Sequence, residues 1–70
     1  MEYIIDQLDS GEWQVRWYFY TNGDTIFCQR TYKRKHNAMI FLARLKDGHF
    51  SEQRQLRWCY HRKSRESAGS

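Results

Sequence analysis

The chain has 70 residues, a formal net charge of +4 and an aromatic content of 17%. This length allows one small domain without a deep core, in which aromatic side chains compensate by burying about 150–250 Å² each. No apolar run is long enough for a transmembrane helix or a secretory signal peptide, so we expect a cytoplasmic protein without membrane contact.

The first predicted strand covers residues 3–8 and turns back through the loop 9–11. Gly11 stands where a three-residue hairpin loop favours the left-handed backbone region. This hairpin places Ile5 opposite Val15 and sets the register of the next strand.

The dipeptide Asn22-Gly23 separates two alternating, aromatic-rich runs. Both positions of a type I′ turn need positive φ, which Asn-Gly adopts easily, so we expect a second hairpin that places Trp17 opposite Cys28. The two hairpin registers agree on one apolar sheet face, which consists of Tyr3, Ile5, Trp13, Val15, Trp17, Phe19, Ile26 and Cys28. Arg30 falls on the same face, which predicts a bulge or an extended side chain near the end of the third strand.

A helix is predicted after the third strand. Its apolar stripe has the i, i+3, i+4, i+7 spacing of an amphipathic helix and consists of Ala38, Phe41, Leu42 and Leu45. Met39 and Ile40 widen this stripe, and Gly48 is placed to end the helix with a left-handed cap.

Residues 56–61 alternate with period two, which favours a fourth strand after a loop over residues 47–53. Leu56, Trp58 and Tyr60 would face the core, and the intervening Arg57, Cys59 and His61 would point away from it. The fold class is therefore α+β, a three- to four-stranded antiparallel sheet in the order βββαβ with one helix on one face. We expect residues 1–62 to form the domain and residues 63–70 a disordered polar, basic tail.

Catalytic and metal-binding motifs are not evident. The acidic residues lie in the first strand and the turns, and the sequence contains neither a nucleophile elbow nor a glycine-rich phosphate loop, so we expect no enzyme and no cofactor. Cys28 and Cys59 are widely spaced without a C-x-x-C motif, which favours two small buried side chains over a disulfide or a metal site.

The sheet face away from the helix offers the candidate binding residues, which are Arg16, Tyr18, Tyr20, Phe27 and Gln29. Rings can stack on bases while Arg and Gln reach base edges or phosphates. Tyr and Arg are also frequent anchors of protein interfaces, and aromatic pairs across strands can stabilise a sheet without any partner. All three interpretations stay open at this point.

Charge is unevenly distributed along the chain, with a net −4 over residues 1–29 and +8 over residues 30–70. Such a basic half is typical of proteins that bind phosphates or an acidic protein surface, although it also suits a solvated face. The basic candidates near the start of the helix and around the last strand are Lys33, Arg34, Lys35, Arg57, Arg62 and Lys63.

Three stretches of the sequence resemble the YegP-like repeat of small bacterial proteins: residues 11–17, residues 22–26, and residues 32–38 with the apolar helix that follows them. The resemblance covers about residues 3–46 and implies a βββα unit. The family usually carries Ser before the helix, where this chain has Arg34, so an N-cap worth roughly 1 kcal/mol is lost. The same order of elements also resembles the arm-type DNA-binding domain of integrases, which would place Arg16, Tyr18 and Gln29 at DNA.

These observations favour a small, non-catalytic basic module that binds nucleic acid, with DNA preferred over RNA, as in an accessory factor of a phage or mobile element. The alternative is a protein-binding module, such as a phage-encoded inhibitor of a host or defence complex. A homodimer formed through a sheet edge is a further expectation.

Overall fold

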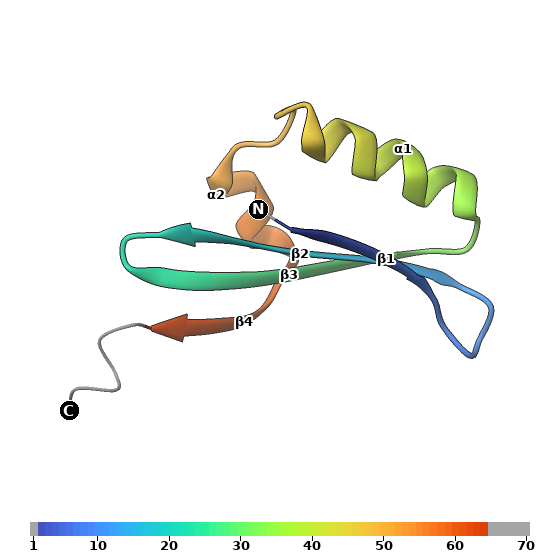
Figure 1. Cartoon of the computed structure of the whole chain (residues 1–70), viewed down its shortest axis with the longest axis horizontal. Helices are drawn as coiled ribbons and strands as arrows, with labels where there is room; N and C mark the ends of the chain where they lie inside the picture. The colour runs from blue at the N-terminus through green and yellow to red at the C-terminus, as the bar shows by residue number, and fades with distance from the viewer. Residues whose placement is uncertain (1, 65–70) are drawn as a thin grey trace.

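The computed structural model describes residues 2–64 as a sheet with two helices on one of its sides (Figure 1). The elements in chain order are β1 (Tyr3–Gln7), β2 (Trp13–Thr21), β3 (Asp24–Tyr32), α1 (Lys35–Lys46), α2 (Glu52–Gln55), the 3₁₀ turn η1 (Leu56–Trp58) and β4 (Cys59–Ser64). The strands form one antiparallel sheet in the order β1-β2-β3-β4. The predicted fold class is confirmed, and the short helix α2 is an addition to it.

Both predicted hairpin registers are confirmed. Trp17 lies opposite Cys28, and Ile5 lies opposite Val15. The backbone explains the agreement, because φ is +92° at Gly11 and +51° and +81° at Asn22-Gly23, as the two turns require. A register of this kind decides which side chains share a face, since neighbouring residues of a strand point to opposite sides.

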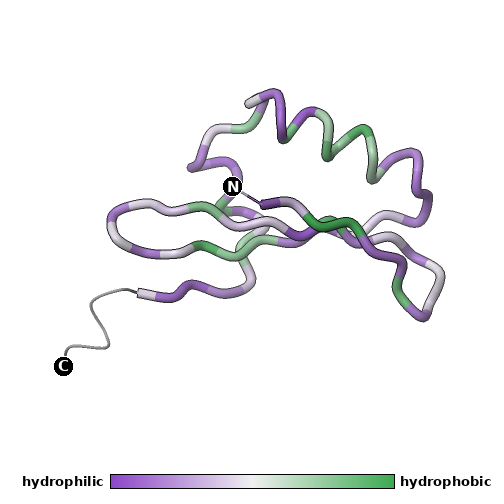
Figure 2. Tube along the Cα trace, viewed as in Figure 1, coloured by the Kyte–Doolittle hydropathy of each residue, from purple (hydrophilic) through white to green (hydrophobic). Residues whose placement is uncertain are grey.

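The core lies between the sheet and α1. Figure 2 shows a hydrophobic stretch of β1 beneath α1 and another in β3, whereas β4 is mostly hydrophilic. The buried apolar side chains are Val15, Trp17, Phe19, Ile26, Cys28, Ala38, Phe41, Leu42 and Leu45. The predicted helix stripe is therefore confirmed, but its widening is wrong, because Met39 and Ile40 are 47% and 39% exposed.

The end of α1 is closed by the glycine that the sequence indicated. Gly48 has φ of +78°, its N–H donates to the Leu45 carbonyl, and the His49 N–H donates to the Arg44 carbonyl. This pair of bonds is a Schellman motif, which satisfies carbonyls of the last turn. At the other end, Arg34 is the N-cap and its side chain makes no capping hydrogen bond, as the resemblance implied.

Arg30 reaches the helix side of the sheet without a bulge between β2 and β3, whose register is continuous. Its guanidinium carbon lies 5.2, 5.1 and 5.0 Å from the ring centroids of Tyr32, Phe41 and Trp58. Of the two predictions for Arg30, the extended side chain is confirmed and the bulge is not. Its cation–π contacts offset part of the free-energy cost of placing a charge beside the core.

The last part of the chain differs from the prediction. Leu56 and Trp58 belong to η1 rather than to a strand, because Ser51 caps α2 by accepting from the Arg54 N–H at 3.2 Å and so starts helical structure before them. The strand begins at Cys59 and includes Lys63 and Ser64, which the sequence assigned to the tail. The rest of the predicted tail, residues 65–70, lies outside the described residues.

A single buried amide connects α2 to the sheet. Gln55 is 5% exposed, and its Oε1 accepts from the Trp17 Nε1–H at 2.9 Å while its Nε2 donates to the Phe50 carbonyl at 2.9 Å. Its backbone carbonyl also accepts from the Cys28 thiol at 3.4 Å. These bonds fix α2, and with it η1 and the start of β4, against the core.

We predict that Gln55→Ala lowers the free energy of unfolding by about 1–3 kcal/mol, since the buried Trp17 N–H loses its acceptor. Chemical denaturation followed by tryptophan fluorescence measures this change. The matched control is Gln53→Ala in the same helix, where the side chain is exposed and the expected change is within about 0.5 kcal/mol. Equal effects of the two variants would contradict the role given to Gln55.

Candidate functional site: the outer face of the sheet

The outer face is the side of the sheet turned away from both helices (Figure 1). The register assigns to it Ile4 and Asp6 of β1, Gln14, Arg16, Tyr18 and Tyr20 of β2, Thr25, Phe27, Gln29 and Thr31 of β3, and Tyr60, His61 and Lys63 of β4. All five candidates that the sequence placed on this face, Arg16, Tyr18, Tyr20, Phe27 and Gln29, are brought together there.

Five rings form a connected group at the centre and one end of the outer face. We call Tyr18, Tyr20, Phe27, Tyr60 and His61 the ring cluster. Ring centroids are 5.7 Å apart for Tyr18 and Tyr20, 5.9 Å for Tyr18 and Phe27, 6.5 Å for Phe27 and Tyr60, and 5.4 Å for Phe27 and His61. Phe27 therefore joins rings from β2 and β4 into one aromatic surface.

A register shift in β4 is the reason that the ring cluster includes two neighbouring residues. Phe27 is opposite His61 while Cys28 is opposite Cys59, so Tyr60 is the extra residue of a β-bulge. Cys59 consequently packs against the core, whereas Tyr60 and His61 both lie beside Phe27 on the outer face. The predictions that Tyr60 faces the core and that Cys59 points away from it are wrong, because a bulge interrupts the alternation on which they depended.

The rings differ in how much of their surface is available. Tyr20 is 69% exposed and Tyr60 is 53% exposed, whereas Tyr18 and Phe27 are half-buried between them. The two exposed rings can therefore present whole faces to a ligand, and the half-buried pair supports them from below.

An apolar groove of about 270 Å³ runs beside the ring cluster toward β1. Its walls include Ile4, Tyr18, Phe27 and Tyr60, and Arg16 and Glu2 stand at its edge. The Glu2 carboxylate, with a smaller contribution from burial, raises the pKa of Tyr18. The groove offers apolar walls, and its lining also includes the donors Arg16, Tyr18 and Tyr60.

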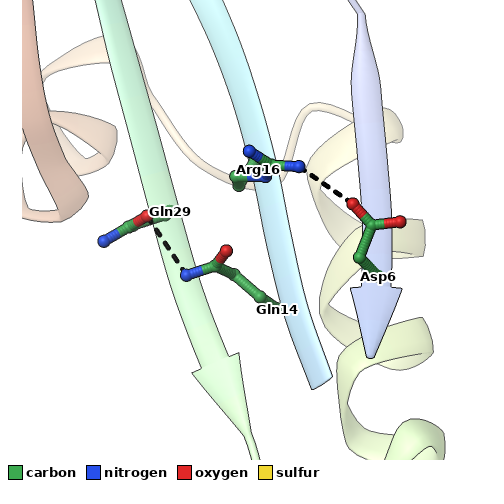
Figure 3. Close-up of polar contacts among 4 residues, drawn as sticks. All are labelled: Asp6, Gln14, Arg16 and Gln29. Atoms are coloured by element: carbon green, nitrogen blue, oxygen red, sulfur yellow. Dashed lines mark hydrogen bonds and ion pairs between the residues drawn. The ribbon is translucent and has the colours of Figure 1, made fainter. Parts of the chain in front are cut away.

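The polar candidates of the outer face are bonded to neighbours (Figure 3). Arg16 donates from NH2 to the Asp6 carboxylate at 2.9 Å, and Gln14 donates from Nε2 to the Gln29 Oε1 at 3.1 Å. The Arg16 charge is thus balanced within the sheet, and the acceptor oxygen of Gln29 is in use. The buried Arg16 Nε has no hydrogen-bond partner among the described residues, so the Asp6 contact occupies only part of this guanidinium.

The basic candidates are dispersed. Lys63 lies on the outer face opposite Thr25. Arg62 lies opposite Ile26 on the helix side and donates from Nε to the Asp24 carboxylate at 2.7 Å, while Arg57 belongs to η1.

Three further basic candidates surround the junction of β3 and α1. Lys33 is exposed there, Arg34 is the N-cap of α1, and the Lys35 Nζ lies 5.1 Å from the centroid of Trp13. This junction is roughly 20 Å along the strand direction from Phe27, so it cannot share one small ligand with the ring cluster.

The two cysteines are close in space. Cys28 and Cys59 face each other across β3 and β4, and both are free thiols. Burial, with a smaller contribution from Cys59, raises the pKa of Cys28 to about 12, so its thiol is protonated at neutral pH. A buried, protonated thiol is a poor nucleophile, in agreement with a packing role for Cys28.

No protein-family model, curated protein or solved structure matches this chain. Among the helices of residues 2–64, none is long and apolar enough to span a membrane.

Proposed function

We propose that this chain binds nucleic acid without catalysis, through stacking of bases on the ring cluster of the outer face. The observation that carries the proposal is a connected surface of five rings on the uncovered side of a sheet, two of them more than half exposed. Stacking on an aromatic side chain contributes about 1–3 kcal/mol per base and tolerates any base, because every base has a π face.

Unpaired bases suit this surface better than a duplex does. Groove readout needs free guanidinium and amide groups, but Arg16 is paired with Asp6 and Gln29 is bonded to Gln14. Lys63 lies beside the ring cluster and supplies a phosphate contact in this proposal, and the net charge of +4 favours the approach of a polyanion. DNA is kept as the preferred nucleic acid in this proposal. The resemblance to the integrase domain supports DNA as the ligand but not the contacts of Arg16 and Gln29, which are bonded within the sheet.

We predict saturable binding of a labelled single-stranded oligonucleotide, tighter than that of the matching duplex, when anisotropy is followed at about 50 and 200 mM salt. Affinity should fall with salt, and Lys63→Gln should reduce the slope of log K against log salt by about 0.7, the value for one lost phosphate contact on a single strand. Parallel DNA and RNA strands test the sugar preference. No measurable binding at about 50 mM salt would rule the proposal out.

Protein binding through the same face is the second candidate, and the groove is the observation that favours it. Ile4 is 48% exposed and forms an apolar wall with Tyr18, Phe27 and Tyr60, as in the centre of a protein interface. An inhibitor acting on a host or defence complex would use this surface, and the open edges at β1 and β4 would allow a homodimer. A pull-down with and without nuclease separates the candidates, since a nuclease-resistant partner lost in Tyr60→Ala supports protein binding.

A further inference from the structure

A second cavity, of about 340 Å³, lies on the opposite side of the sheet from the ring cluster. It is bounded by the end of β3, by α1 and by the segment that leads into α2. Its polar lining consists of Arg30, Tyr32, Asn37, Arg44 and Arg54, and Phe50 forms part of its apolar wall. None of the residues that line it is acidic.

The three arginines of this cavity form no ion pair with a carboxylate of residues 2–64. Within the part of the chain that the structure describes, the ion pairs join Arg16 to Asp6 and Arg62 to Asp24. Arg30, Arg44 and Arg54 are therefore left without a carboxylate partner among residues 2–64. Like charges gathered around one cavity repel each other, and a bound anion would remove that repulsion.

Arg30 is held rigidly at the inner end of the cavity. Its guanidinium carbon lies 5.0–5.2 Å from three ring centroids, and Arg54 is placed similarly, with its guanidinium carbon 5.6 Å from the centroid of Phe50. Burial raises the pKa of Tyr32, and the positive charges of Arg30 and Arg44 act against this rise. The Arg30 guanidinium, which lies over three rings, loses little entropy when it binds an anion.

We propose that this cavity binds the phosphate group of a small organic phosphate. Guanidinium groups form paired, charge-assisted hydrogen bonds with phosphate oxygens, and the Asn37 amide and Tyr32 hydroxyl supply further donors. The volume lies near the lower end of the range for small-molecule sites, about 300–1,000 Å³, which suits a phosphate with part of its carrier. The site is separate from the ring cluster and independent of the proposed function.

The test uses the full chain with inorganic pyrophosphate, adenosine 5′-monophosphate and uncharged adenosine as probes. Trp58 reports binding through its fluorescence, because its ring contacts Arg30, and thermal unfolding gives a second readout. We expect saturable binding of both phosphates with a dissociation constant on the order of 1 mM or tighter, and no binding of adenosine.

Arg44→Gln and Arg54→Gln should each weaken phosphate binding about tenfold or more, since each removes a charge-assisted hydrogen bond to the phosphate, and tenfold corresponds to about 1.4 kcal/mol. Both side chains are exposed, so the variants should fold. The matched control, Lys46→Gln, removes the same charge from an exposed position of α1 whose ammonium lies beside Tyr3 and not at the cavity, and should change the affinity less than about twofold.

Two results would overturn the proposal: equal binding of adenosine and its monophosphate, or equal weakening by Lys46→Gln and Arg44→Gln. Absence of saturable binding by either phosphate would also overturn it. Tyr60→Ala separates this site from the outer face, because it should leave phosphate binding unchanged whether or not the ring cluster binds nucleic acid.

Discussion

Replacing Phe41 with alanine is expected to leave the chain largely unfolded at 25 °C. Phe41 is 4% exposed, and its ring centroid lies 5.2–5.7 Å from those of Trp17, Tyr32, Phe50 and Trp58. Truncation of a buried Phe costs about 3–5 kcal/mol, and native domains are stable by only about 5–15 kcal/mol, with small ones near the lower end.

Circular dichroism and chemical denaturation measure this effect. Met39→Ala, also in α1, is the matched control, because Met39 is 47% exposed and its truncation should change stability by about 0.5 kcal/mol or less. A folded Phe41→Ala protein with a loss below about 1 kcal/mol would contradict the view that one aromatic cluster between α1 and the sheet stabilises this fold.

Much of the sheet could be predicted because the information for it is local. Each hairpin depends on one glycine-containing turn, and two independent turns gave registers that agree on the core face. The outer-face residues of β2 and β3 followed directly from this register, so Tyr18, Tyr20 and Phe27 could be grouped on one face from the amino-acid sequence alone.

The features that the sequence did not predict depend on contacts between distant parts of the chain. Nothing in the sequence around Tyr60 distinguishes a bulge from regular alternation, so Tyr60 was assigned to the core face, whereas the prediction that His61 points away from the core is confirmed. Gln55 is buried only because Trp17 and Phe50 supply its partners. The cavity lined by Arg30, Arg44 and Arg54 likewise combines residues of β3, α1 and α2. The sequence indicated only that Arg30 falls on the core face. Membership of the YegP-like family stays a prediction.

Loss of the exposed rings is expected to weaken nucleic-acid binding strongly while leaving the fold intact. Tyr20→Ala and Tyr60→Ala should each weaken binding of a single-stranded oligonucleotide by roughly 5- to 150-fold, if each ring stacks on one base at about 1–3 kcal/mol. Both rings are more than half exposed, so these variants should lose little stability. Effects on the duplex should be smaller, because its bases are already stacked on one another.

Removal of charge from the same face should act differently. Lys63→Gln should weaken binding mainly at low salt, since it removes a phosphate contact and leaves the stacking surface unchanged. Met39→Ala on α1 removes an exposed apolar side chain from the other side of the sheet and should leave binding unaffected.

The most direct test of the account is the dissociation constant for one single-stranded oligonucleotide, measured at fixed salt for the unmodified chain, Tyr60→Ala, Lys63→Gln and Met39→Ala. The account predicts saturable binding that weakens at least about fivefold in Tyr60→Ala and is unchanged in Met39→Ala. Binding that is insensitive to Tyr60→Ala, or no binding by the unmodified chain, would contradict a base-stacking role for the outer face.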